Sequence, residues 1–278
     1  MPTMQIDNPS SRQYVADWVE FKLCVTGEDL SKSELSSFIE DSSGSEPTNE
    51  FIDDVWNELE RRVLLYGDQP PFELSPRLVT PSITWEDCPE YLMCIILSID
   101  GNSAEVAKTG KLFERLSCKA VRNYFGGDAV IYGFPQKQSV QDICTQMYER
   151  FGFNPSANFK DRGVDIICWK PFGDRRKSQL AAIIQCAAGH NWEKKLLSVP
   201  LDAWRQYISW SGSLPLKGFT TPIIIEDNEF HDVVTDAGLM FDRPRLYRNV
   251  HSIADTDLSL KTDLITWCQN RVSNFVSN

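Results

Sequence analysis

Two polar side chains interrupt apolar, strand-like runs of the sequence, and both carry oxygen atoms that could bind a cation. Asp165 lies within the run Val164–Trp169, and Gln185 is the first polar residue after five apolar ones in Leu180–Cys186. A buried polar group is costly unless it is hydrogen-bonded or holds a cation. Carboxylate, amide and backbone carbonyl oxygens are the ligands that Mg²⁺ prefers. These residues predict a metal site where the two runs lie side by side.

A third oxygen ligand is expected from the helix that precedes them. Residues 105–125 have helical periodicity, with one apolar line formed by Leu112, Leu116, Ala120 and Tyr124. Glu114 shares a flank of this helix with Cys118 and Val121, so it lies at the edge of the buried face. That position directs its carboxylate toward the predicted sheet.

Each of these residues also has a purely structural interpretation. Asp165 could pair with Arg162 or Lys170 at a strand end. Gln185 could be a hydrogen-bonded core amide, and Glu114 a solvated helix residue. Their order, one on a helix and one on each of two strands, favours a shared metal site over three separate explanations.

The segments that must position these residues alternate between helical and extended patterns. Helices are predicted over 105–125, 140–151, 192–210 and 257–276, and strands over 129–134, 164–169, 180–186 and 221–226. The polar turn 171–178 makes a hairpin of the two strands that flank it. The predicted fold class is α/β, with a central mixed sheet flanked by helices.

The first hundred residues differ from the rest in charge and pattern. They contain 20 Asp and Glu against 6 Lys and Arg, a net charge of −14, whereas the remainder carries +3. Helices are predicted over 12–26, from Thr48 onward and over 85–98, with a loop at 40–47 and an irregular, proline-containing connector at 70–81. We therefore expect an acidic helical region over 1–100, which docks a partner or regulates, and a second domain over 101–278.

Three short motifs occur in the order helix, strand, strand. They are Gly-x-x-Phe-Glu (Gly110, Phe113, Glu114), Asp-x-Gly-x-Asp (Asp161, Gly163, Asp165) and apolar-Gln-Cys (Gln185, Cys186). This order resembles the PD-(D/E)xK restriction-endonuclease-like superfamily, and the Gln variant resembles its Mrr-like branch. The resemblance covers residues 108–226 and implies a restriction-endonuclease-like core in which Glu114, Asp165 and Gln185, with the Cys186 carbonyl, hold Mg²⁺ or Mn²⁺. It further implies a metal-activated water molecule that attacks a phosphodiester.

The lysine that this superfamily places two residues after the Glu or Gln is missing, because Ala187 stands there. Lys194 and Lys195, on the following helical segment, are the candidates to orient or deprotonate the attacking water in its place. An alternative hypothesis is that catalysis is lost and the fold serves as an adaptor or nucleic-acid-binding subunit. A third is a structural interaction protein built on the acidic N-terminal helices.

The resemblance implies a DNA endonuclease of a bacterial restriction or antiphage defence system, acting with a partner subunit or as a homo-oligomer. Ten basic against five acidic side chains between residues 160 and 220 could follow a phosphate backbone. The sequence shows no apolar stretch long enough for a membrane helix, no secretory signal and no CxxC among its eight cysteines. These features favour a cytoplasmic protein with free thiols. Walker A and dinucleotide-binding motifs are also missing.

Overall fold

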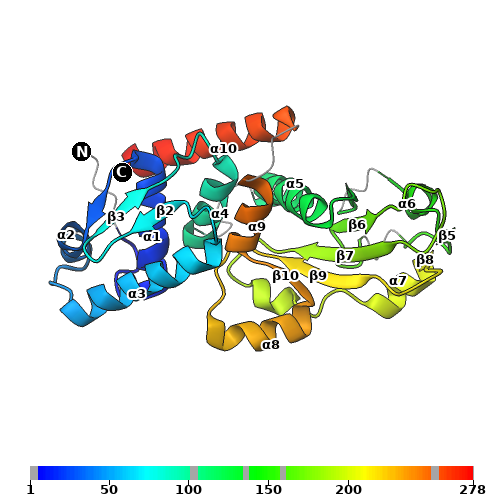
Figure 1. Cartoon of the computed structure of the whole chain (residues 1–278), viewed down its shortest axis with the longest axis horizontal. Helices are drawn as coiled ribbons and strands as arrows, with labels where there is room; N and C mark the ends of the chain where they lie inside the picture. The colour runs from blue at the N-terminus through cyan, green and yellow to red at the C-terminus, as the bar shows by residue number, and fades with distance from the viewer. Residues whose placement is uncertain (1–5, 101–105, 134–137, 157–160, 252–256, 278) are drawn as a thin grey trace. The chain divides into compact units, whose positions relative to one another are not determined.

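The computed structural model describes residues 6–100, 106–133, 138–156, 161–251 and 257–277, and the chain divides into two compact units (Figure 1). One unit comprises Met1–Gly101 and Ala254–Asn278, and the other Asn102–Ile253. The boundary near residue 100 agrees with the sequence analysis. Helix α10 (Leu258–Ser277), expected in the second domain, instead packs on α4 (Pro89–Asp100) within the first unit. Its buried Cys268 thiol donates there to the Pro89 carbonyl at 3.4 Å.

The first unit is mainly helical. Besides α4 and α10 it contains α1 (Arg12–Thr26), α2 (Lys32–Ser43), α3 (Asn49–Tyr66) and an antiparallel sheet in the order β1 (Leu30–Ser31), β3 (Leu78–Pro81), β2 (Phe72–Leu74). Side-chain caps explain where two helices begin, since Ser11 accepts from the Tyr14 N–H and Thr48 from the Phe51 N–H. Helix α1 and the Thr48 helix start are confirmed.

Two parts of the first unit differ from the sequence prediction. Helix α2 continues to Ser43 and ends at Gly44 in a left-handed conformation (φ 74°), so it occupies the first half of the predicted loop 40–47. The connector 70–81 is not irregular but contains β2 and β3. Prolines obscured these strands in the sequence, yet Pro71 precedes β2 and Pro81 ends β3, where a missing N–H interrupts little of the ladder.

A charged network lies in the core of the first unit. The Arg62 side chain is 1% exposed and contacts three carboxylates, those of Asp17 at 2.6 Å, Glu20 at 2.8 Å and Glu58 at 2.7 Å. The Tyr66 hydroxyl donates to Glu20 at 2.7 Å. These bonds join α1 to α3 through a single guanidinium, because such a group can donate to several oxygens at once.

The second unit contains a five-stranded mixed sheet. Its order is β10 (Leu239–Phe241), β9 (Leu216–Thr220), β7 (Leu180–Cys186), β6 (Ile166–Lys170), β4 (Asp128–Ile131). Strand β6 is antiparallel to both of its neighbours, β4 and β7, whereas β7, β9 and β10 run parallel to one another. The predicted hairpin of 164–169 and 180–186 is confirmed, and the chain is a mixed α/β protein with helices flanking the sheet.

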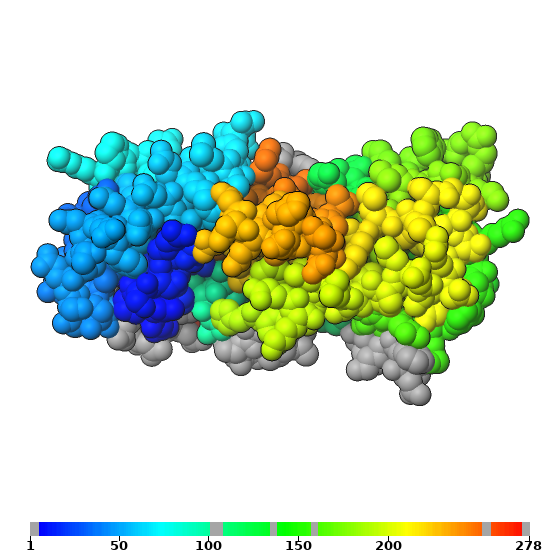
Figure 2. Space-filling view, turned by 90° about the horizontal axis from the view of Figure 1, so that it is seen from below, coloured from blue at the N-terminus to red at the C-terminus, as the bar shows by residue number. Residues whose placement is uncertain are grey.

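Helices cover both faces of this sheet (Figure 1). On one face lies α5 (Val106–Phe125), whose Ser117 hydroxyl is 2.9 Å from that of Thr220 in β9. On the other, α8 (Asp227–Ala237) and the 3₁₀ helix η2 (Trp192–Lys195) pack in one apolar cluster with Phe219. Figure 2 shows this surface, with α8 in orange beside the yellow-green segment that holds η2. Elsewhere, α6 (Val140–Met147) and α7 (Leu201–Tyr207) contribute Ile143 and Trp204 to a second cluster.

Several predicted elements of this unit have different bounds. The helix expected over 140–151 ends at Met147, and the one expected over 192–210 is split into η2 and α7. The last residues of both predicted helices instead form a two-stranded antiparallel sheet of β5 (Arg150–Phe151) and β8 (Ile208–Ser209). Helix α9 (Arg243–His251) completes the unit.

The strand predicted over 221–226 was wrong, because β9 ends before it. Pro222 lacks the N–H that a strand ladder needs, which disfavours a strand over 221–226. In β9, Gly218 lies so close to β7 that a Cβ added to it would be 2.3 Å from Ile184 Cδ1. The eight cysteines are free thiols. Within the described parts of the chain, no helix is both long and apolar enough to cross a membrane.

Candidate functional site

The carboxylates of Glu114 and Asp165 converge above Gly133, just beyond the end of β4. From the point that a Cβ on Gly133 would occupy, Glu114 Oε2 is 3.0 Å away and Asp165 Oδ1 is 3.3 Å away. One carboxylate comes from α5, and the other from the residue that precedes β6. The structure thus brings together two of the predicted ligands, and a glycine keeps the space between them open.

Main-chain hydrogen bonds from both neighbouring strands hold Asp165. Its N–H donates to the Ile184 carbonyl at 2.9 Å, and its own carbonyl accepts from the Tyr132 N–H at 2.7 Å. The side-chain atom Oδ2 accepts from the Cys186 N–H at 2.7 Å. The other carboxylate oxygen, Oδ1, is the one nearest Gly133, so it faces the same space as Glu114.

The two carboxylates are difficult to ionise together. Burial raises the pKa of Asp165 from 3.8 to about 7, and the charges of Glu114 and Asp161 add to this effect, while the Cys186 N–H opposes it. Burial also raises the pKa of Glu114, opposed chiefly by Lys111. Two desolvated carboxylates in one place are a setting that favours a shared cation.

Lys111 is a component of this site that the sequence analysis missed. Its Nζ lies 2.8 Å from Glu114 Oε2 and 3.2 Å from Oε1, one helical turn upstream. The Lys-x-x-Glu spacing of an i,i+3 pair was the available signal. Lys194 and Lys195, the predicted replacement lysines, are both exposed residues of η2. The charge of Lys195 also opposes the rise in the pKa of Glu114.

The other predicted ligands lie on β7, the strand that pairs with β6. Extending the β6–β7 register by one position places Gln185 opposite Asp165, and the buried Gln185 Oε1 makes no hydrogen bond within the described structure. Cys186 contacts Asp165 through its N–H, and its carbonyl remains a predicted ligand. Asp161, which was not predicted as a ligand, accepts from the Gly163 N–H at 3.0 Å. Across the described residues, no three His, Cys, Asp or Glu side chains form a metal-binding group.

The position at which the superfamily has its lysine is buried among apolar side chains. Ala187 is 1% exposed and belongs to the apolar cluster that contains Trp192 and Phe219. Its N–H donates to the Thr220 carbonyl at 3.0 Å. A lysine here would place an ammonium group among apolar side chains, so any catalytic cation must come from elsewhere.

The raised pKa of Asp165 predicts how stability depends on pH without metal. The folded protein binds more protons than the unfolded chain between pH 3.8 and about 7, so the free energy of unfolding falls as pH rises through this window. The slope contributed by one such group reaches about 1.4 kcal/mol per pH unit. Urea unfolding in EDTA should show this decline, and Asp165→Asn should reduce it. An unchanged slope in the variant would contradict the assignment.

No protein-family model, curated protein or solved structure matches the chain. The fold and the site therefore define a class only at the level of a mixed α/β protein. It has a five-stranded sheet and two carboxylates that converge at the strand ends. Its function has to be inferred from its own residues.

Proposed function

We propose that the second unit is a restriction-endonuclease-like core that hydrolyses phosphodiester bonds in DNA with Mg²⁺ or Mn²⁺. The observation that carries this proposal is the convergence of Glu114 Oε2 and Asp165 Oδ1 on one space over Gly133. They come from a helix and from the start of a hairpin strand, the order in which the sequence motifs resemble that superfamily.

The donor atoms fit a hard divalent cation. Glu114 and Asp165 would supply carboxylate oxygens, and Gln185 a buried amide oxygen that has no hydrogen-bond partner among the described residues. The Cys186 carbonyl is the fourth candidate. Such an all-oxygen set suits Mg²⁺, which usually keeps several water ligands as well. A cation held here would lower the pKa of a bound water and neutralise charge on the scissile phosphate.

The protein's own groups would orient this chemistry. Because the Cys186 N–H holds Asp165 Oδ2, the carboxylate presents Oδ1 without rotating freely. Lys111, held by Glu114, places an ammonium group beside the carboxylates, where it can offset phosphate charge. We assign the role of the missing lysine to Lys111 or Lys195, because the charges of both affect the pKa of Glu114. Lys194 is the weaker candidate.

The adaptor hypothesis remains the second candidate, favoured by the closed, apolar surroundings of Ala187. Under it the chain would bind nucleic acid or a partner subunit without cleaving. The acidic segment 1–100, with its net charge of −14, would in either case repel DNA and dock a basic partner. A role in bacterial restriction or antiphage defence is part of the proposal and rests on the superfamily resemblance.

Cleavage assays separate the two candidates. Supercoiled plasmid, linear duplex DNA and RNA are incubated with Mg²⁺ or Mn²⁺ and with EDTA. We expect metal-dependent cleavage of DNA, reduced at least about a hundredfold by Glu114→Gln, because removing one charge-stabilising group at a reacting centre costs about this much. Glu193→Gln, which neutralises an exposed carboxylate of η2, is the matched control and should cleave normally. Equal cleavage by Glu114→Gln would contradict the nuclease proposal.

Crowding the space between the carboxylates should weaken metal binding. A Cβ in Gly133→Ala would lie 3.0 Å from Glu114 Oε2, so that carboxylate must shift by a few tenths of an ångström. We expect Mg²⁺ affinity to fall about tenfold, equivalent to about 1.4 kcal/mol, by calorimetry. Gly110→Ala, on the helix that carries Glu114, is the control, since its Cβ would meet nothing within 4 Å. If the two variants bind metal equally well, the site lies elsewhere.

A further inference from the structure

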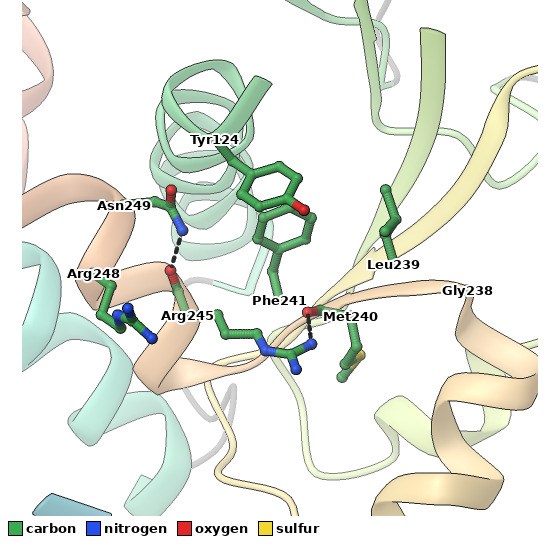
Figure 3. A pocket seen from close by; sticks show the side chains of 8 residues that line it. All are labelled: Tyr124, Gly238, Leu239, Met240, Phe241, Arg245, Arg248 and Asn249. Carbon is green, nitrogen blue, oxygen red and sulfur yellow. Dashed lines mark hydrogen bonds between the residues drawn. The ribbon is translucent and has the colours of Figure 1, made fainter. Parts of the chain in front are cut away.

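A pocket of about 500 Å³ lies in the second unit, between the end of α5, the edge strand β10 and helix α9 (Figure 3). Its lining residues are Tyr124, Gly238, Leu239, Met240, Phe241, Arg245, Arg248 and Asn249. The volume is within the range of small-molecule sites, about 300–1,000 Å³. None of these residues belongs to the candidate metal site, so the pocket needs a separate explanation.

The α9 wall of the pocket presents polar groups from one side of a helix. Arg245, Arg248 and Asn249 are three and four residues apart, which places them on the same face (Figure 3). Arg245 is held in place, since its Nη1 donates to the Met240 carbonyl at 2.9 Å and its guanidinium lies 4.9 Å from the Phe230 ring centre. This bond uses one of the several N–H donors of the group. The wall therefore combines an oriented guanidinium with a second arginine.

The opposite wall presents an aromatic ring. Tyr124 was expected on the apolar line of its helix, and Leu112, Leu116 and Ala120 of that line are buried. Tyr124 itself is 56% exposed and contacts Phe241 edge-to-face, with ring centres 5.2 Å apart. This contact supports the ring from one side and leaves much of it accessible. An exposed, supported aromatic ring is a common stacking platform for a nucleobase.

The charge of the pocket defines the chemistry of its ligand. Its lining includes two arginines and no acidic side chain, in a chain whose net charge is −11. Guanidinium groups bind phosphate through charge-assisted hydrogen bonds. We propose that the pocket binds a nucleotide unit, with its base against Tyr124 and its phosphate at Arg245 and Arg248. A free nucleotide and a nucleotide within a strand share this chemistry.

Calorimetry in EDTA tests the proposal without any cleavage. The probes are the four common nucleoside 5′-monophosphates, inorganic phosphate and a short single-stranded oligonucleotide. We expect Arg248→Gln and Tyr124→Ala each to weaken nucleotide binding at least about tenfold, equivalent to about 1.4 kcal/mol. Arg150→Gln removes the same charge from an exposed side chain of the same unit, in β5, and should bind as the wild type does. Thermal unfolding of each variant confirms that it is folded.

The probes distinguish the two sources of the ligand. Binding of monophosphates with this variant pattern would assign the pocket to a soluble nucleotide, and binding of the oligonucleotide alone would assign it to a strand. Equal affinity of wild type and both variants, or no binding of any nucleotide probe, would overturn the proposal. If inorganic phosphate binds as tightly as the nucleotides, the base does not contribute to binding, and the proposed stacking on Tyr124 is wrong. The calorimetry contains EDTA and measures binding without cleavage, so failure here is separable from failure of the nuclease proposal.

Discussion

Asp165→Asn should abolish metal-dependent DNA cleavage. The substitution keeps the size of the side chain and an oxygen able to accept from the Cys186 N–H, which now lies 2.7 Å from Oδ2. It removes the negative charge that would hold a cation and stabilise its bound water. A loss of about 4 kcal/mol of transition-state stabilisation corresponds to about a thousandfold lower rate. Initial rates of plasmid nicking with Mg²⁺ measure the effect.

Misfolding can be separated from loss of charge in this variant. Burial already favours the neutral form of Asp165 and raises its pKa to about 7, so a neutral amide should not destabilise the metal-free protein at neutral pH. Asp202→Asn, which changes a 95% exposed side chain of the same unit, is the control and should retain full activity. A folded Asp165→Asn protein that cleaves at the wild-type rate would show that this carboxylate is not part of a nuclease site.

Arg62→Met should be the most destabilising substitution in the first unit. It removes the guanidinium that contacts Asp17, Glu20 and Glu58 together, and leaves these three carboxylates buried without that cation. Arg61 still contacts Glu58 at 2.9 Å in the variant, so Asp17 and Glu20 are the carboxylates most affected. Breaking a buried ion pair by deleting one partner typically costs about 3–5 kcal/mol, because the remaining charge is still desolvated. Methionine retains much of the aliphatic volume, so the expected loss is mainly electrostatic. Urea unfolding measures it.

The control for Arg62→Met is a surface pair of the same unit. Lys32 lies 2.6 Å from Asp53, whose side chain is 63% exposed, and Lys32→Met should cost at most about 1 kcal/mol because solvent screens such pairs. If Arg62→Met costs no more than Lys32→Met, the buried network does not stabilise the fold.

Local features of the chain were predictable from the sequence. Helix α1, the Thr48 cap and the hairpin of β6 and β7 depend on apolar periodicity, side-chain caps and a polar turn, all of which act over a few residues. The placement of Glu114 at the edge of a buried helix face followed in the same way. These predictions held because neighbouring residues supply the interactions that decide them.

The tertiary structure decided which distant residues share a surface. Gly133 was not singled out in the sequence, yet it defines the space between Glu114 and Asp165. Strand β9 was missed because Gly218 has a low strand propensity, although close packing against β7 requires a glycine there. Helix α10 could have joined either unit, since its apolar stripe specifies burial but not a partner. Tyr124 fits the apolar line of α5 but lines a pocket, because β10 and α9 leave its ring uncovered. Periodicity and caps are short-range, whereas strand order and the meeting of side chains depend on packing between segments far apart in the chain.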